Sequence, residues 1–389
     1  MSELFESSAA YVSTVCYFAA LVGSAYALFA IWAARSFVCR PRPAPLANCP
    51  PVTILKPLHG AEPDLYANLA SFCRQDYPAP VQVLFGLSDS ADPAATVVRR
   101  LIADFPDRDL DLVINARGHG ANAKVSNLIN MQPAARHEMI VIADSDIVVP
   151  PNYLANVMAN LSQPGVGLAT CPYRGVGATG IWSRLAAAGI DYQFLPNVLV
   201  GLKLGLATPC FGSTIALTKT TLTKLGGLQS VADQLADDYA LGMAVRRVGL
   251  QVAIPPFIVT HVCAERSLRE LLLREIRWAR TIRAMDSLGF AGLAVTYAVP
   301  LALLGVILGG LTPAASVLVV APACRFALQA ELHRLLQLRN GIFWLGPIRD
   351  ILSFVVFVAS FFGRRVEWRG HRYGVKADHT VAYYGEVET

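Results

Sequence analysis

The residues of this chain best suited to chemistry are two carboxylates that follow a short apolar run. Asp144 and Asp146 come directly after residues 139–143, in the pattern Asp-Ser-Asp. In extended chain, residues two apart point to the same side, so both carboxylates face one point. Such a pair suits a hard divalent cation, which completes its coordination shell with water and substrate phosphate oxygens. The pattern predicts a metal site, and a helix-capping or turn role is the open alternative.

A second acidic pair, Asp237 and Asp238, lies further along the chain. It precedes an amphipathic stretch over residues 240–248, so one of the two could cap that helix. In the functional alternative, Asp238 is a general base that takes the proton from an attacking hydroxyl. The pattern alone leaves both roles open.

Basic residues that could bind phosphate accompany these acids. Arg274, Arg277 and Trp278 share one helical face by their i, i+3 and i+4 spacing. The arginines suit bidentate contacts to phosphate oxygens, or alternatively a membrane surface with the tryptophan as interfacial anchor. Lys56 and Lys124 each follow a predicted strand and either neutralise a diphosphate or are simply solvated.

Asp89 and Asp92 follow another predicted strand, at residues 81–87, and are candidates to bind the base or ribose of a nucleotide. Further Asp-x-Asp spacings over residues 107–111 fall in a charged segment typical of a surface turn. The histidines, His261 among them, are isolated in the sequence, which favours structural roles over metal binding.

The elements that position these residues alternate between two periodicities. Strands are predicted at 52–56, 81–87, 110–115 and 139–143, and helices at 63–73 and 94–105. This alternation predicts a mostly parallel sheet in an α/β domain. Ligands of such sheets bind beyond the carboxyl ends of the strands, where Lys56, Asp89 and Asp144 are expected.

The composition indicates a membrane protein. Of 389 residues, 54% are hydrophobic and only 16% are charged, which is unusual for a soluble enzyme. Residues 11–34 exceed the roughly 20 apolar residues needed to cross a bilayer. Arg35, Arg40 and Arg42 follow this stretch, so the positive-inside rule places the N-terminus outside and the middle of the chain in the cytoplasm.

We therefore predict an N-terminal anchor (1–40), a cytoplasmic catalytic domain (41–265), an amphipathic interfacial helix (266–288), a transmembrane or re-entrant region (289–365) and a cytoplasmic tail (366–389). Within the fourth segment, residues 289–311 are expected to span outward and 312–328 to return. Residues 342–362 are interrupted by Arg349 and Asp350. They form either a re-entrant segment or a spanning helix with a buried pair.

Other features exclude some classes of protein. The eight cysteines form no CxxC pair, so neither a zinc site nor a disulfide framework is indicated. The net charge of +5 comes without a basic stripe that carries interleaved aromatic residues, so nucleic acid is not expected as a partner.

Taken in order, the motifs resemble the ceramide glucosyltransferase family of membrane glycosyltransferases. The motifs that carry the resemblance are Lys56-Pro-Leu-His-Gly60, Asp89-x-x-Asp92-Pro-Ala94, Lys124-Val-Ser-Asn-Leu128, Asp144-Ser-Asp146, Ala236-Asp-Asp-Tyr239, Arg274-x-x-Arg277-Trp278 and residues 368–373. They run through residues 52–373 with their spacing intact. Asp237 departs from the pattern, because ceramide enzymes commonly have Glu there.

The resemblance implies a GT-A fold, a Rossmann-like α/β domain, with transmembrane helices at both ends. It also implies a UDP-sugar donor, a membrane lipid acceptor and inversion at the anomeric carbon. Asp92 would bind the nucleotide, Asp144 and Asp146 would hold Mg²⁺ or Mn²⁺ and the diphosphate, and Asp238 would be the catalytic base. Arg274, Arg277 and Trp278 match the family's terminal motif.

Several segments look like the bacterial hopanoid-associated branch of this family: 124–131 with 134–137, 142–147 and 277–283. That branch implies transfer of N-acetylglucosamine to bacteriohopanetetrol at the cytoplasmic face of a bacterial inner membrane. The alternatives are a ceramide glucosyltransferase, a processive polysaccharide synthase and an inactive nucleotide-binding or scaffolding membrane protein.

Overall fold

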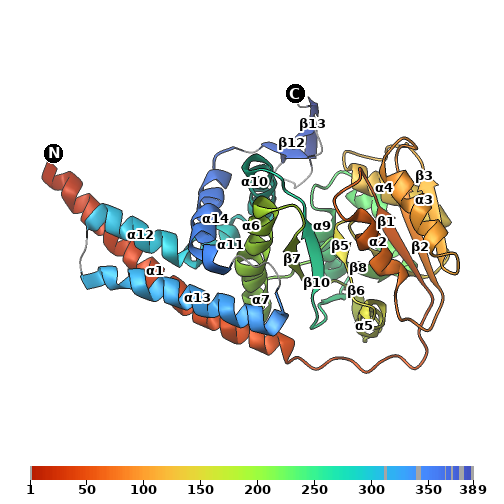
Figure 1. Cartoon of the computed structure of the whole chain (residues 1–389), viewed down its shortest axis with the longest axis horizontal. Helices are drawn as coiled ribbons and strands as arrows, with labels where there is room; N and C mark the ends of the chain where they lie inside the picture. The colour runs from red at the N-terminus through yellow and green to blue at the C-terminus, as the bar shows by residue number, and fades with distance from the viewer. Residues whose placement is uncertain are drawn as a thin grey trace.

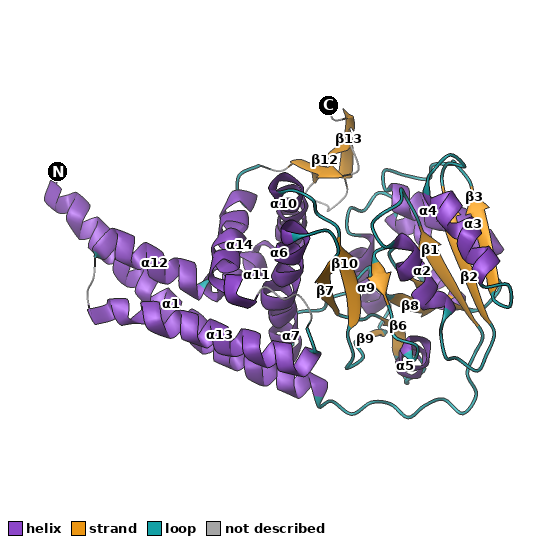
Figure 2. Ribbon diagram, in the orientation of Figure 1, coloured by secondary structure: helices purple, strands orange, loops and turns teal. Residues whose placement is uncertain are grey.

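The structure is a computed structural model that describes residues 2–310, 313–338, 343–363, 365–368, 371–375 and 381–386. An α/β domain lies at one side, and long helices extend away from it at the other (Figure 1). Figure 2 shows that strands and helices are mixed in the first part, whereas the second is almost wholly helical.

A seven-stranded sheet in the order β3-β2-β1-β4-β8-β6-β9 forms the centre of the α/β domain. Its strands are β1 (Val52–Pro57), β2 (Val81–Leu87), β3 (Asp109–Ile114), β4 (Met139–Ile142), β6 (Val166–Ala169), β8 (Ile215–Thr218) and β9 (Gln251–Ala253). β1 to β4 pair in parallel, and β8 runs antiparallel to β4 and β6. The four strands predicted from the sequence are confirmed to within one residue, as is the α/β fold class.

Helices and a small second sheet surround this sheet. The helices are α2 (Leu65–Cys73), α3 (Ala94–Asp104), α4 (Ala123–Met131), η1 (Gln132–Ala134), α5 (Tyr153–Leu161), α8 (Lys219–Lys224), η3 (Leu228–Val231) and α9 (Asp237–Arg247). The second sheet has the order β5-β10-β7, with β5 (Ile147–Val148), β10 (Val259–Cys263) and β7 (Tyr173–Gly177). It continues directly from the Asp-Ser-Asp segment.

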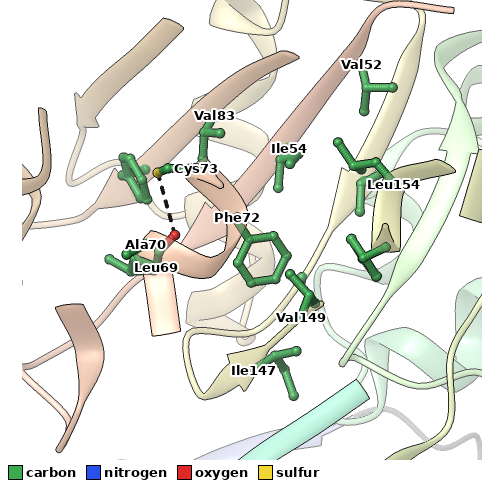
Figure 3. Packing of buried hydrophobic residues seen from close by; sticks show 14 of the residues in the cluster. Val52, Ile54, Leu69, Ala70, Phe72, Cys73, Val83, Ile147, Val149 and Leu154 are labelled. Carbon is green, nitrogen blue, oxygen red and sulfur yellow. Dashed lines mark hydrogen bonds between the residues drawn. The ribbon is translucent and has the colours of Figure 1, made fainter. Parts of the chain in front are cut away.

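Apolar periodicity explains why α2 packs on the sheet. Leu65, Leu69 and Phe72 recur at i, i+4 and i+7 and are all buried. Phe72 lies among Ile54 and Val83 of the sheet in Figure 3. Each such side chain contributes about 1.5–3 kcal/mol by leaving water. This packing holds the strand ends that carry the polar residues.

The helical region contains three helices long and apolar enough to cross a membrane among the described residues: Ser8–Val38, Ile181–Leu204 and Ala314–Leu336. A bent pair, Ser287–Thr296 with Ala298–Gly309, turns by 70° and could form a fourth span. The helices here are α1 (Ser2–Val38), α6 (Ile181–Gly189), the π-helix η2 (Ile190–Phe194), α7 (Leu195–Leu204), α10 (Leu268–Met285), α11 (Ser287–Gly292), η4 (Leu293–Thr296), α12 (Ala298–Gly309), η5 (Pro313–Ser316), α13 (Val317–Leu336), η6 (Phe343–Leu345) and α14 (Gly346–Ser360).

These helices partly differ from the predicted ones. The N-terminal apolar helix and the helix over the Arg-x-x-Arg-Trp motif are present. The stretch 289–311 is not one straight span, because it breaks at Tyr297 between η4 and α12. The expected return over 312–328 is longer, since α13 continues to Leu336. The helix Ile181–Leu204 was not predicted as a separate long helix.

Arg349 and Asp350, expected as a buried pair in α14, are both buried but bind different helices. Asp350 pairs with Arg325 of α13, and Arg349 pairs with Glu275 of α10 at 2.8 Å. The two ion pairs therefore fasten α14 to one apolar helix and to the helix that carries the terminal motif.

A third, antiparallel sheet lies near the C-terminus, with β11 (Arg365–Trp368), β12 (His371–Val375) and β13 (Val381–Glu386). The motif noted at 368–373 falls partly outside the described residues, at 369–370.

The contact between β7 and α6 joins the α/β domain to the helical region and generates a stability prediction. A Cβ atom on Gly175 would lie 2.6 Å from Ala187 Cα and 2.8 Å from Ala187 O of α6. Because these are backbone atoms, Gly175→Ala should destabilise the fold by about 1–3 kcal/mol. We expect the purified variant in detergent to have a lower melting temperature than the wild type. Intrinsic fluorescence during heating measures it.

Gly118→Ala is the matched control, because a Cβ there has nothing within 4 Å. Equal melting temperatures for the two variants would contradict this account of the interface.

Candidate functional site

Asp144 and Asp238, two of the acidic residues predicted from the sequence, meet at the backbone of Gly212. The Gly212 amide donates to Asp238 Oδ2 at 2.9 Å, and the Asp144 amide donates to the Gly212 carbonyl at 3.2 Å. A Cβ on Gly212 would lie 2.5 Å from Asp144 Oδ2 and 3.2 Å from Lys124 Nζ. Only a glycine leaves room for these groups to approach one another, so the end of β4 and the start of α9 form one cluster.

Lys124 balances the charge of this cluster. Its Nζ lies 2.7 Å from Asp144 Oδ1 and 3.3 Å from Asp237 Oδ2. α4 positions it, with Asn122 as N-cap accepting from Val125 N and donating to Asp237 Oδ1 at 3.3 Å. Burial opposes the charge of Lys124, but the carboxylates outweigh that effect and raise its pKa. The lysine therefore stays protonated.

The carboxyl groups differ in how readily they lose a proton. Burial, then repulsion by Asp237, raises the pKa of Asp238 to about 6. Burial likewise raises the pKa of Asp144, against the attraction of Lys124. A carboxylate with a pKa near 6 is ionised at neutral pH and is a stronger base than an ordinary aspartate.

Asp146 has a partner that sequence analysis missed. His261 of β10 places Nδ1 3.3 Å from Asp146 Oδ1. Burial works against the charge of Asp146, but His261 outweighs it and lowers the pKa of the carboxyl. Antiparallel pairing of β10 with β5 sets His261 opposite Ile147 and thus beside Asp146. Nothing local in the sequence signals this, since the two residues are far apart along the chain.

The Arg-x-x-Arg-Trp helix approaches the site through His261. The Trp278 ring lies 6.0 Å from the imidazole, and the Arg274 guanidinium lies 4.8 Å from the centre of the Trp278 ring. Arg274 is also paired with Glu265. Arg277 lies one turn along the same helix, α10. The terminal motif thus lies beside the Asp146–His261 pair.

Lys56 binds the backbone of the Asp-Ser-Asp segment. It is fully buried, donates to the Asp144 carbonyl and has its ammonium 3.8 Å from the centre of the Phe72 ring. Burial lowers its pKa to about 7. Lys56 therefore stabilises the backbone of the segment by this hydrogen bond, and its side chain is not exposed to solvent.

Asp89 and Asp92 lie in the loop after β2, and Asp92 also binds the loop after β1, the strand next to β4. Asp92 accepts from the amides of Gly60 (2.9 Å) and Ala94 (2.8 Å). Asp89 is exposed and accepts from the Ala91 amide. The structure thus places Lys56, Lys124, Asp144 and Asp238 in one cluster and these two aspartates in a neighbouring loop.

The part of the chain that the structure describes contains no group of three or more His, Cys, Asp or Glu positioned to hold a metal. Asp146 Oδ1 and His261 Nε2 are nevertheless buried without a hydrogen-bond partner. Carboxylate oxygens suit Mg²⁺ or Mn²⁺, provided that water and a ligand phosphate complete the shell. The residues therefore fit a cation that binds together with a diphosphate.

Known proteins resemble the chain in sequence and in fold. A mannosyltransferase from Pyrobaculum calidifontis, solved with GDP-mannose and Mn²⁺, has a TM-score of 0.53 at 22% identity and covers 90% of this chain and 99% of its own. Ceramide glucosyltransferase 1 of Caenorhabditis elegans is 26% identical over 243 residues, which are 62% of this chain and 52% of that protein. A ceramide glucosyltransferase of Gibberella zeae is 34% identical over 150 residues, 35% of this chain and 28% of its own.

The chain spans about half the length, or less, of these curated relatives. The fold likeness to the mannosyltransferase confirms the predicted GT-A architecture. The profile of glycosyl transferase family 21 matches residues 15–381, which is nearly the whole chain. The resemblance to the ceramide glucosyltransferase family is thus confirmed, and the protein belongs to glycosyl transferase family 21.

Proposed function

We propose that this protein transfers a hexose from a UDP-sugar to a hydroxyl of a membrane lipid, with inversion at the anomeric carbon. The first candidate reaction is N-acetylglucosamine transfer to a hopanoid, bacteriohopanetetrol. The second is glucose transfer to ceramide, which the names of the curated relatives favour. The observation that carries the proposal is the position of Asp238, a carboxyl with a raised pKa joined through Gly212 to the lysine-paired Asp144.

In this proposal Asp238 accepts the proton of the lipid hydroxyl as its oxygen attacks the anomeric carbon. UDP leaves from the opposite face of the sugar. Lys124 pairs with Asp144 and Asp237 but makes no ion pair with Asp238, which leaves the Asp238 carboxyl to accept the proton. Asp144 and Asp146 would hold Mg²⁺ or Mn²⁺, whose charge would stabilise the departing diphosphate, and His261 would orient Asp146.

The remaining residues are proposed to bind the substrates. Asp89 and Asp92 would contact the nucleoside from the loop beyond β2. Arg274 and Arg277, with Trp278, would contact the diphosphate or the acceptor. The apolar helices fit a membrane-associated enzyme. We propose that the catalytic domain faces the cytoplasm at the inner membrane of a bacterium.

The test is a transfer assay with the purified full chain. Labelled UDP-N-acetylglucosamine or UDP-glucose is incubated with vesicles that contain bacteriohopanetetrol or ceramide, and the product is identified by mass spectrometry. We expect one sugar per lipid. Asp238→Asn should lower turnover about 10²–10⁴-fold, because the general base is lost, while UDP binding persists. Asp104→Asn, on the exposed end of α3, is the control.

A polymeric product would instead indicate a polysaccharide synthase. Wild-type turnover in Asp238→Asn would reject the base, and absence of transfer to any lipid would reject the function.

The raised pKa of Asp238 predicts how transfer depends on pH. Below about pH 6 the carboxyl is protonated and cannot accept a proton, so kcat/KM should fall about tenfold per pH unit. Above that pH the carboxylate is free and the rate should level off. The measurement is kcat/KM at constant ionic strength from about pH 5 to pH 8. A constant rate between pH 5 and pH 6 would contradict the assignment.

The contact between His261 and Asp146 predicts a metal phenotype. His261→Ala should raise the Mn²⁺ concentration for half-maximal activity at least about tenfold, because a neighbour of the cation is lost. Mn²⁺-dependent UDP binding, measured by calorimetry, should weaken in parallel. His137→Ala is the control, since His137 lies at the opposite end of β4. Unchanged metal dependence in His261→Ala would show that the imidazole has no part in the site.

A further inference from the structure

A cavity lies among the apolar helices, outside the site described above. Its volume is about 300 Å³, and it is lined by residues of α12, α13 and α14. Figure 1 shows these helices beside one another and on the far side of α6 and α7 from the central sheet. Val299, Pro322, Phe326 and Pro347 make most of its wall apolar. A cavity of this size and lining suits part of an apolar ligand.

The polar part of this cavity is an ion pair. Arg325 Nε donates to Asp350 Oδ2 at 2.8 Å, and both side chains are about nine-tenths buried or more, at 6% and 5% exposure. Charged residues within apolar helices are costly and usually mark a functional site. The pair has no net charge, yet it presents a donor and an acceptor beside an apolar wall.

The same ion pair is connected to the carboxylate cluster. Arg325 Nη2 donates to Gln193 Oε1 at 3.2 Å. The next residue, Phe194, stacks on Tyr173 at 5.0 Å, and the Tyr173 ring lies 5.5 Å from His261. Gln193 and Phe194 belong to the π-helix η2, an element frequent at functional sites. This helical turn thus contacts Arg325 of the cavity on one side and, through Tyr173, approaches His261 on the other.

We propose that this cavity binds the lipid acceptor, which would be a neutral lipid carrying hydroxyl or amide groups near its hydrocarbon. The inference rests on the proposed lipid transfer and names where the acceptor is held. A hydroxyl or amide can donate to Asp350 and accept from Arg325, while the hydrocarbon packs on Phe326 and Val299. A charged headgroup would leave one charge uncompensated in an apolar setting, which is strongly unfavourable.

The binding test uses the full chain in phosphatidylcholine vesicles with a ceramide analogue that carries a photoactivatable diazirine in its acyl chain. We expect cross-links to peptides of α13 and α14, mapped by mass spectrometry. Ala323 lines the open side of the cavity, so Ala323→Phe should obstruct it and lower this labelling at least fivefold. Val319→Phe is the matched control, one turn earlier on the same helix and 74% exposed. Equal melting temperatures would show that both variants fold.

A diazirine-labelled phosphatidylcholine separates the acceptor from ordinary bilayer lipid. Equal labelling of the cavity by both probes, insensitive to Ala323→Phe, would overturn the inference. Kinetics give a second readout on whichever of ceramide and bacteriohopanetetrol the wild type glycosylates. Ala323→Phe should raise KM for that lipid about tenfold and leave KM for the UDP-sugar unchanged. An unchanged lipid KM would also overturn it.

Failure of this inference differs from failure of the proposed function. If the wild type transfers sugar but the cavity is not labelled and Ala323→Phe leaves the lipid KM unchanged, only the proposed acceptor site is rejected. If the ceramide analogue labels the cavity selectively but no lipid receives a sugar, the proposed reaction is rejected and the lipid-binding site stands.

Discussion

The site depends on one buried interaction, the contact of Lys124 with Asp144 and Asp237. Three carboxyl groups and Asp146 crowd a small region at the end of β4, and their mutual repulsion must be offset. Lys124 does this at 2.7 Å and 3.3 Å from two of them. For the buried Lys124–Asp237 pair, removing one partner typically costs about 3–5 kcal/mol, whereas the Asp144 side chain is 36% exposed and its pairing is worth less. The carboxylate cluster is therefore stabilised by the position of Lys124 on α4, beside the end of β4.

The carboxyl groups of the cluster also differ in their charged partners. Asp144 and Asp237 share one cation, Lys124, and Asp146 is paired with His261, whereas Asp238 accepts hydrogen bonds from the backbone amides of Gly212 and Tyr239. Its pKa rises because burial and Asp237 oppose its charge without an equal opposing cation. In the proposed reaction, Asp238 is therefore the carboxyl assigned to proton transfer.

Ion pairs also connect the helical region to this cluster. Arg349 with Glu275 fastens α14 to α10, and Arg325 with Asp350 fastens α14 to α13. α10 then presents Trp278 to His261. These contacts therefore connect the apolar helices to residues beside the proposed metal site.

The sequence by itself determined the strands, because short apolar runs bounded by turn residues have few other solutions. It also indicated the Asp-Ser-Asp pair, whose members lie two residues apart after a strand, although Asp146 lies in a turn and not in extended chain. It did not reveal the helix Ile181–Leu204, whose glycines and scattered aromatics obscure its periodicity and whose spanning window is 72% buried inside the fold. Nor did it reveal that 289–311 breaks at Tyr297.

Tertiary structure alone decided the partners. The meeting of Lys124, Asp144 and Asp238 requires α4, β4 and α9 to converge on Gly212. The contact of His261 with Asp146 requires the antiparallel register of β5 and β10. Charges and carboxylates are visible in a sequence, but which of them neutralise one another depends on distances of about 3 Å between distant segments. Only the packed sheet sets those distances.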